Sequence, residues 1–510
     1  MWLLALRNFL LKPWRSLFLL LGYSLGVAVM IVLLSIGEAL LAQARDERLV
    51  GGGEITVLPE GIDVEVMKTG GLGGMFFSID HARFIYRQLL AAPRLAPWVR
   101  AAAPQIEGKL LYLRTGNARE IPVRASGDLP SRDAAVGAAP SVAAGAWADD
   151  SLDRRWRDPT AAELRDDIDH FHLPPDSARG DPTWAEWHYF NVLSADARKW
   201  AYVSFIVGGA VPDGRWGGQV LVTLHAQGGV SRRFVADAPA RDVHFSTTRA
   251  DLTIGRSTVR LQPDGRYAVR AHAVAERGAG AVDVDLVVTP APGAYFPGAS
   301  LTSGTAPSGY VVPALRADAT GSICLTTRGA PPWPAGCEHV SGVQAYHDHN
   351  WGVWRGVTWQ WGAARAGPFA LLYGRVESRD SAAAGQPLFV YLVDSLGFTA
   401  LFRPHDIQYV DDRRIAVPGR TILAPSRAVM FAAHGDDSLR ITLDIEDATA
   451  TDTRRPAGAR GDAPVTGGIG SGREALRPYF IQMKGVARLE GRVHGRRIRA
   501  AGTGFFETYR

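Results

Sequence analysis

The apolar positions of this chain follow three successive patterns, and the first predicts a membrane helix. From Leu17 to Ala42 the sequence is almost wholly apolar, interrupted by Ser24, Ser35 and Glu38. A helix rises about 1.5 Å per residue, so this run is long enough to cross a hydrocarbon core about 30 Å thick. We therefore expect one transmembrane helix. A cleaved signal peptide is the alternative, but its apolar run is usually only about 7 to 15 residues long.

The second pattern predicts a small α/β unit. A β-like run from Glu54 to Leu58 precedes a glycine-rich loop, and Ser78 can cap a helix whose apolar residues recur on one face up to Leu90. Short strands are expected at residues 109–114 and 121–125. Residues 127–181 are rich in Ala, Asp, Arg and Pro, which favours helical turns and a connector.

The third pattern predicts that the rest of the chain is mainly β. Beyond Trp184, short alternating or apolar runs are separated by Gly, Asp and Pro, as in antiparallel sheets. The length allows two barrel-like β units of roughly 150 residues each. We place the domain boundaries to give residues 1–45 (cytoplasmic N-terminus and helix), 46–165 (α/β fragment and connector), 166–345 (first β unit) and 346–510 (second β unit).

Charge predicts an orientation in the membrane and excludes one class of partner. The net charge is only +5 over 510 residues, without a basic block or a nucleic-acid motif, so we expect no nucleic-acid partner. Arg7, Lys12 and Arg15 precede the apolar run without any acid, whereas the charges of residues 45–48 cancel. The positive-inside rule then places the N-terminus in the cytoplasm. We expect a single-pass inner-membrane protein with its bulk in the periplasm.

The strongest candidate for a functional site lies between residues 346 and 361. The sequence there reads Tyr346-His347-Asp348-His349-Asn350-Trp351-Gly352, followed by Trp354, Trp359 and Trp361. Burial among aromatic side chains keeps a carboxylic acid protonated, and indole faces stabilise a carbocation. We therefore predict Asp348 as the proton donor of acid-initiated alkene chemistry, oriented by Tyr346 or a histidine. The alternative is that Asp348 and Asn350 cap a turn.

Strand geometry divides this motif into two faces. If residues 346–351 form a strand, Tyr346 and Asp348 lie on one side, whereas His347, His349 and Trp351 lie on the other. Two histidines on one face can bind a metal with Asp348 or a distant third ligand. Without a recognisable metal motif, we expect neither a metal nor a cofactor.

A second candidate cluster and a cysteine pair complete the set. Glu186 is a candidate acid or base, or the partner of an arginine, and it lies in the run Trp184-Ala185-Glu186-Trp187-His188-Tyr189. We expect substrate contacts from Trp187, His188, Tyr189, Trp351, Trp359 and Trp361, although the tryptophans can equally serve packing. Glu507 is expected only to close the last strand beside Arg510. Cys324 and Cys337 bracket a short loop, which fits either a disulfide or two free thiols.

The C-terminal part resembles the carotenoid 1,2-hydratase (hydroxyneurosporene synthase) family and the related AttH-like proteins. The matching segments are Trp184–Asn191, Tyr310–Pro313 with Gly321, Tyr346–Gly352, and Gly504–Tyr509. This resemblance implies two lipocalin-like β-barrel units and a cofactor-free hydratase (hydro-lyase), with Asp348 as the proton donor. Relatives of unassigned or pericyclic activity leave the substrate open.

The N-terminal part resembles ABC-transporter permeases of the macrolide-exporter type. The resemblance rests on Arg7-Asn8-Phe9-Leu10-Leu11-Lys12-Pro13 and on the glycines of the following helix. It implies a fragment of a periplasmic core domain, but the further membrane helices of that family and a nucleotide-binding loop are missing from this sequence. We therefore weigh three functions: a membrane-anchored hydratase or isomerase of an apolar isoprenoid or lipid, a lipid-binding barrel serving an ABC-transporter ATPase and permease, and a regulatory permease subunit.

Overall fold

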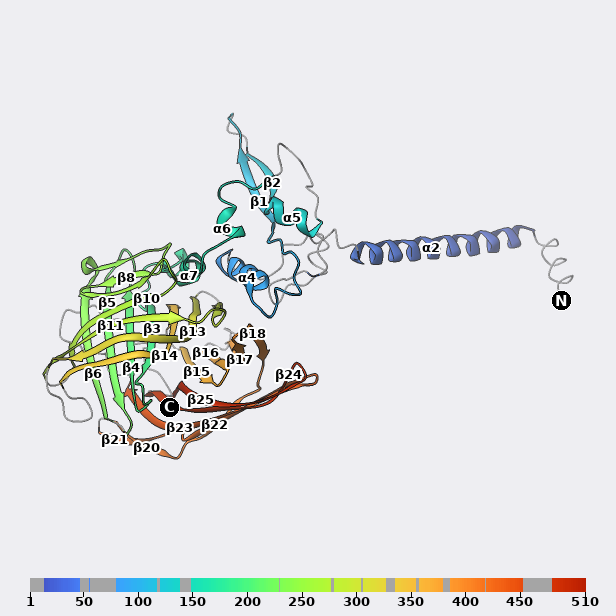
Figure 1. Cartoon of the computed structure of the whole chain (residues 1–510). Helices are drawn as coiled ribbons and strands as arrows, with labels where there is room; N and C mark the ends of the chain where they lie inside the picture. Colours follow the sequence, from blue (N-terminus) through green and yellow to red (C-terminus); the bar gives the residue numbers. More distant parts are fainter. Residues whose placement is uncertain are drawn as a thin grey trace. The chain divides into compact units, whose positions relative to one another are not determined.

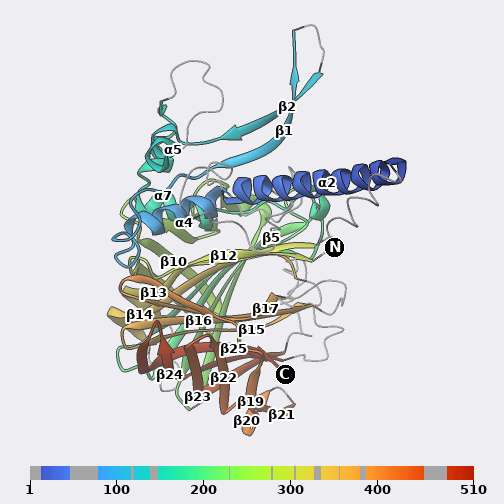
Figure 2. The same ribbon diagram turned by 90° about the vertical axis from the view of Figure 1, so that its right-hand side faces the viewer.

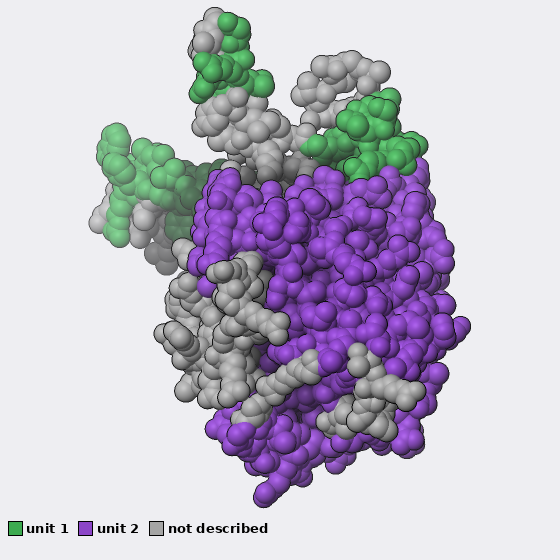
Figure 3. Space-filling view, turned by 90° about the vertical axis from the view of Figure 1, so that its left-hand side faces the viewer, with its two compact units in different colours: residues 1–77, 101–157 green, residues 78–100, 158–510 purple. Residues whose placement is uncertain are grey.

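The computed structural model describes residues 13–45, 55, 79–116, 120–137, 148–228, 230–276, 279–303, 306–326, 335–354, 357–378, 386–417, 419–452 and 479–510. The run predicted at Glu54 to Leu58 lies outside these residues, except for Ile55. The chain divides into two compact units, one of residues 1–77 and 101–157 and the other of residues 78–100 and 158–510 (Figure 3).

The first unit contains the predicted membrane helix. Helix α2 (Pro13–Arg45) is apolar and long enough to cross a membrane over Pro13–Ser35. The unit also contains a two-stranded antiparallel sheet of β1 (Ile106–Arg114) and β2 (Glu120–Gly127), together with the short helices α5 (Pro130–Val136) and α6 (Arg154–Arg157). Both strands were expected from the sequence, and each extends a few residues beyond its predicted bounds.

The second unit is mainly β, as predicted, and its first sheet closes into a barrel of eight strands. Neighbouring strands follow the order β11-β13-β14-β3-β4-β5-β6-β10, and β10 pairs again with β11. These strands are β3 (Trp184–Leu193), β4 (Lys199–Gly209), β5 (Trp216–Ala226), β6 (Val230–Pro239), β10 (Tyr267–Ala275), β11 (Ala281–Pro290), β13 (Ala306–Leu325) and β14 (Gly336–Val353). The same sheet includes β7 (Val243–Phe245), β8 (Asp251–Ile254), β9 (Ser257–Leu261) and β12 (Phe296–Ser303).

The second sheet is an open, curled half-barrel of nine strands rather than a second closed barrel. Its order is β18-β17-β16-β15-β25-β24-β23-β22-β19. The strands are β15 (Val357–Ala366), β16 (Phe369–Ser378), β17 (Gln386–Asp394), β18 (Gly397–Phe402), β19 (Ile407–Val410), β22 (Arg427–His434), β23 (Asp437–Asp452), β24 (Tyr479–Val493) and β25 (Arg496–Tyr509), with the separate hairpin β20 (Arg413–Val417) and β21 (Arg420–Ala424). Figures 1 and 2 show the barrel in green to yellow and the half-barrel in orange to red.

Strand β14 belongs entirely to the first barrel, so that barrel extends past the boundary predicted at residue 345. Residues 345–353 of β14 pair with β3. Every residue of β3 is buried, because one face of this strand lines the barrel interior and the other packs against the half-barrel. Strand β10 instead alternates between buried and more exposed positions, as expected where the outer face meets water. Side chains on both faces of β3 and of residues 345–349 of β14 are therefore shielded from solvent.

Two helices accompany the barrel. Helix α4 (Ile79–Ala91) contacts helix α7 (Ala161–Asp169), and Arg83 forms a buried ion pair with Asp167 at 2.6 Å. Thr160 caps α7 through a reciprocal capping box with Glu163. Two 3-10 turns, η2 (Asp176–Ala178) and η3 (Ala240–Asp242), also belong to the described part of this unit. Because α7 ends at Asp169, it delivers a carboxylate into the barrel.

Candidate active site between the two sheets

Strand β14 places the predicted site residues on two opposite faces. Alternation directs Tyr346 and Asp348 toward the half-barrel, where Tyr346 belongs to an apolar cluster shared by both sheets. His347 and His349 point into the first barrel, where both contact Asp169. The predicted alternation is present, and both faces are buried. The five candidate catalytic residues therefore form two separate buried groups: Tyr346 and Asp348 face the half-barrel, whereas His347, His349 and Glu186 lie inside the first barrel. The turn-capping alternative is wrong, because Asp348 lies within β14.

Asp348 lies among hydroxyl and indole groups on the half-barrel side. Its Oδ1 accepts a hydrogen bond from Asn350 Nδ2 at 2.7 Å. Burial is the largest cause that raises the pKa of Asp348, and the nearby charge of Glu507 raises it further. Hydrogen bonds from Tyr346 and Asn350 lower this pKa, and the resulting pKa is about 8. Trp361 Nε1 donates to the Tyr346 hydroxyl at 2.9 Å, which fixes the phenol beside the acid. Asp348 is therefore a protonated acid at neutral pH.

Glu507 is the second carboxyl group of this site, and its position was not expected from the sequence. Its two oxygens accept hydrogen bonds from Tyr189 Oη at 2.9 Å and Trp359 Nε1 at 3.0 Å. Burial raises the pKa of Glu507, while these hydrogen bonds oppose the rise. Its expected neighbour Arg510 instead donates to Asp411 at 2.9 Å. Glu507 and Asp348 thus form a pair of interacting buried carboxyl groups.

Three of the four indoles predicted to touch substrate, those of Trp187, Trp359 and Trp361, lie on the side of this pair, together with Trp354, whereas Trp351 lies in the barrel. The ring centroids of Trp187 and Trp354 are 4.8 Å apart, and those of Trp187 and Trp359 are 6.3 Å apart. Trp359 is only partly buried, so the cluster extends from the protein surface to Glu507. Together with Tyr189 and Trp361, these residues form an aromatic surround for the two carboxyl groups. We call this group the interface site.

The remaining predicted residues lie inside the first barrel and form a second group around Asp169. Glu186 Oε1 accepts from His349 Nε2 at 2.7 Å and contacts His172 Nδ1 at 3.0 Å. Glu186 therefore pairs with histidines rather than with an arginine. His188 also faces this group, and Trp351 stacks on His172 with ring centroids 3.6 Å apart.

Asp169 holds the barrel group together. It contacts His347 Nε2 at 3.1 Å and His349 Nδ1 at 2.8 Å, and it accepts from Tyr267 Oη at 2.6 Å. Burial would lower the pKa of His349, but the hydrogen bonds and charges of Asp169 and Glu186 raise it to about 9. Asp169 is thus the distant carboxylate that contacts the histidine face of β14. The sequence alone did not identify it.

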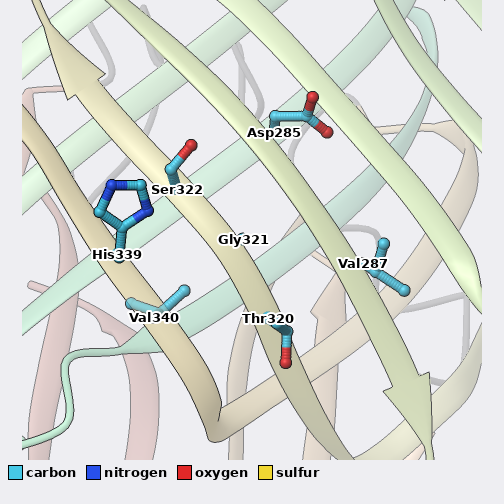
Figure 4. A pocket seen from close by; sticks show the side chains of 7 residues that line it. All are labelled: Asp285, Val287, Thr320, Gly321, Ser322, His339 and Val340. Atoms are coloured by element: carbon cyan, nitrogen blue, oxygen red, sulfur yellow. The ribbon is translucent and has the colours of Figure 1, made fainter.

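The predicted cysteine pair and an open groove lie on the edge of the barrel. Cys324 and Cys337 face each other on β13 and β14 and are joined by a disulfide. Nearby, an open groove of about 490 Å³ crosses β11, β13 and β14 (Figure 4). It is lined by Asp285, Val287, Thr320, Gly321, Ser322, His339 and Val340. None of the predicted catalytic or substrate-binding residues lines this groove.

Comparisons with known proteins identify similar solved structures but no family. No protein-family model and no curated protein match the chain. An AttH-like protein of Nitrosomonas europaea is 15% identical, with a TM-score of 0.41 over 67% of this chain and 97% of that one. Kievitone hydratase from Nectria haematococca is 10% identical, with a TM-score of 0.38 over 67% and 94% of the two chains. CghA solved with Sch210972 is 16% identical, with a TM-score of 0.38 over 64% and 89%. At these TM-scores, the likeness assigns neither an activity nor a substrate to this chain.

Proposed function

We propose that the chain is a cofactor-free acid–base catalyst of the hydratase or isomerase type, acting on an unsaturated apolar molecule at the interface site. The observation that carries this proposal is the pair of buried carboxyl groups, Asp348 and Glu507, within an aromatic surround. Two carboxyl groups in different hydrogen-bonding environments are suited to opposite roles as acid and base. An apolar isoprenoid or lipid fits the chemistry of the surrounding side chains.

In the proposed mechanism, Asp348 donates its proton to one carbon of a C=C bond. A new C–H bond forms, the π bond breaks, and a carbocation develops beside the indole faces, which stabilise positive charge. In hydration, the oxygen of a water molecule then bonds to the cation while Glu507 accepts the water proton. In isomerisation, Glu507 instead removes a proton from a neighbouring carbon. Asp348 finally takes up a proton from solvent and Glu507 releases its proton to solvent, so neither route consumes a cofactor.

Neighbouring side chains would position these groups. Tyr346 is held by Trp361 and orients the carboxyl group of Asp348, whereas Tyr189 and Trp359 direct the oxygens of Glu507. Burial strengthens each of these electrostatic interactions, because little water competes for the same groups. Indoles near the cation would also exclude water until the reaction needs it.

Membrane attachment and orientation belong to the same proposal. Helix α2 would anchor the protein next to an apolar substrate, with the N-terminus in the cytoplasm and the β unit in the periplasm. Alkaline-phosphatase fusions after residue 60 should be active in a bacterial host, and activity of cytoplasmic reporters at the same position would contradict this orientation. Association with an ABC-transporter ATPase and permease stays a prediction from the N-terminal sequence.

The lipid-binding barrel is less well supported by the packing. Side chains of Phe190, Val203, Phe205 and Phe234 fill the first barrel and are fully buried, so an acyl chain would have to displace them. A non-catalytic role would therefore have to use the interface site as well. The two functions then differ in whether the bound molecule is chemically changed.

Isotope incorporation tests the proposal even though the substrate is not identified. The full chain is incubated with lipid extracts in D₂O or in H₂¹⁸O, and products are analysed by untargeted mass spectrometry. Hydration introduces both ¹⁸O and deuterium on carbon, isomerisation introduces deuterium alone, and pure binding introduces neither. Asp348→Asn should lower the labelling rate by about 10² to 10⁴-fold, as expected for loss of a general acid. Asp285→Asn, which changes an exposed carboxylate, serves as the matched control. Full labelling by Asp348→Asn would refute the mechanism.

A further inference from the structure

The proposed chemistry leaves unused the polar cluster inside the first barrel, where one ring nitrogen of His188 makes no hydrogen bond. His188 is 2% exposed, and its Nδ1 has no hydrogen-bond partner. This nitrogen lies 3.5 Å from Asp169 Oδ1 and points into the cluster. A buried polar atom without a partner is costly, so its retention requires an explanation.

The atoms around His188 have the composition of a metal site. His349 Nδ1 lies 2.8 Å from the same Asp169 oxygen, and one ligand atom from each of the three residues lies within 4.8 Å of the others. Imidazole nitrogen and carboxylate oxygen together suit borderline divalent ions such as Zn²⁺. We propose that Asp169, His188 and His349 bind one divalent transition-metal ion inside the first barrel.

The surrounding side chains already orient two of these ligands. His349 Nε2 donates to Glu186 at 2.7 Å, which leaves its Nδ1 to face Asp169 and His188. The second oxygen of Asp169 contacts His347 and accepts from Tyr267 Oη at 2.6 Å, so the first oxygen remains directed at the site. Carboxylates behind ligating histidines and hydrogen bonds behind ligating carboxylates are the usual outer partners of bound metals.

The two distances to Asp169 require only a small adjustment, and the third pair, His188 and His349, lies within 4.8 Å. A Zn²⁺ ion bonds nitrogen and oxygen at about 2.0 to 2.1 Å, so tetrahedral ligands lie roughly 3.3 Å apart. The His188–Asp169 distance of 3.5 Å is close to this value. The His349–Asp169 pair, at 2.8 Å, must open by roughly 0.5 Å.

Binding would link three elements that are distant in sequence. Asp169 ends α7, His188 lies on β3 and His349 lies on β14. The ion would therefore fasten the helix to the barrel, and its role would be structural. The acid chemistry at the interface site lies on the opposite face of β14, so the two proposals can fail independently.

The test uses the full chain in detergent after removal of metals with a chelator. We expect one tightly bound Zn²⁺ or Co²⁺ per chain by elemental analysis after desalting, and a rise in melting temperature of roughly 2 °C or more at saturating metal. His188→Gln should lose the bound ion and the temperature rise. His225→Gln is the matched control, because His225 is also buried but lies on the outer face of β5, where it contacts Ser231 and Asp447. Retention of the ion by His188→Gln would overturn the proposal.

Spectroscopy on the wild-type chain covers the case in which His188→Gln does not fold. Electron paramagnetic resonance of bound Cu²⁺ should show hyperfine coupling to two imidazole nitrogens. Absence of tightly bound metal, or of nitrogen coupling, would leave the cluster as a hydrogen-bonded network only and would refute the site.

Discussion

Replacing Asp348 with Asn should change how the stability of the protein depends on pH, even without a known substrate. The pKa of Asp348 is about 8 in the folded protein, because burial and the charge of Glu507 raise it from 3.8. Between these values the folded chain holds a proton that the unfolded chain releases. The stability of the wild type therefore falls as pH rises from about 4 to about 8.

The size of the effect follows from the same two values. One pKa unit corresponds to about 1.4 kcal/mol. Over the three pH units from pH 5 to pH 8, ionisation of Asp348 therefore lowers the free energy of unfolding by at most about 4 kcal/mol. Asn cannot ionise but can still accept the hydrogen bond from Asn350. The variant should therefore match the wild type near pH 5 and be more stable than the wild type near pH 8.

Denaturant unfolding of both proteins at pH 5 and pH 8 measures this difference. Chelator-treated protein should be used, so that no metal ion adds charge behind β14. The exposed-site variant Asp285→Asn should follow the wild type at both pH values, because this carboxylate is mostly solvated. If Asp348→Asn and the wild type lose the same stability between pH 5 and pH 8, the pKa of Asp348 is not raised in the folded protein.

Three further variants address the base, the disulfide and a glycine. Glu507→Gln keeps the acceptor for Tyr189 but removes the base, so turnover in the isotope assay should fall by about 10² to 10⁴-fold with little change in circular dichroism. Replacing Cys324 and Cys337 by Ser should lower the free energy of unfolding by roughly 3 kcal/mol, measured by denaturant titration under oxidising conditions. Gly321→Ala should cost at least about 1 to 3 kcal/mol in the same titration, because φ is +145° and a Cβ atom would lie 2.0 Å from a backbone oxygen; unchanged stability would contradict this.

The alternation of β14 was predictable because a strand turns successive side chains to opposite faces. Tyr346 and Asp348 therefore separate from His347 and His349, as the sequence indicated. Burial of both faces was not predictable, because it depends on the half-barrel covering one side of the barrel. The mainly β class was also evident from short runs and turn residues. The first sheet closes into a barrel because β10 pairs with β11, whereas the second sheet stays open. Such pairing between strands is not encoded in the local sequence pattern.

Asp169 and Glu507 were missed for a related reason. Asp169 precedes His349 by 180 residues, and Glu507 follows Tyr189 by 318, so nothing local connects them. One signal was present: α7 ends in the sequence Asp166-Asp167-Ile168-Asp169, which places negative charge at the negative end of the helix dipole. Acids in this unfavourable position indicate compensating partners, here Arg83 for Asp167 and the histidines of the barrel for Asp169.

The two-sided strand β14 makes this protein unusually sensitive to a change in chain length. Because side chains alternate with a period of two, deleting one residue just before Tyr346 would move every following side chain to the other face. The imidazoles would then point at the half-barrel, and the carboxyl group of Asp348 would enter the barrel. Substitutions can alter either group separately, but a single-residue insertion or deletion would exchange both at once. Natural or engineered variation in this strand is therefore expected to proceed by replacement and never by an odd change in length.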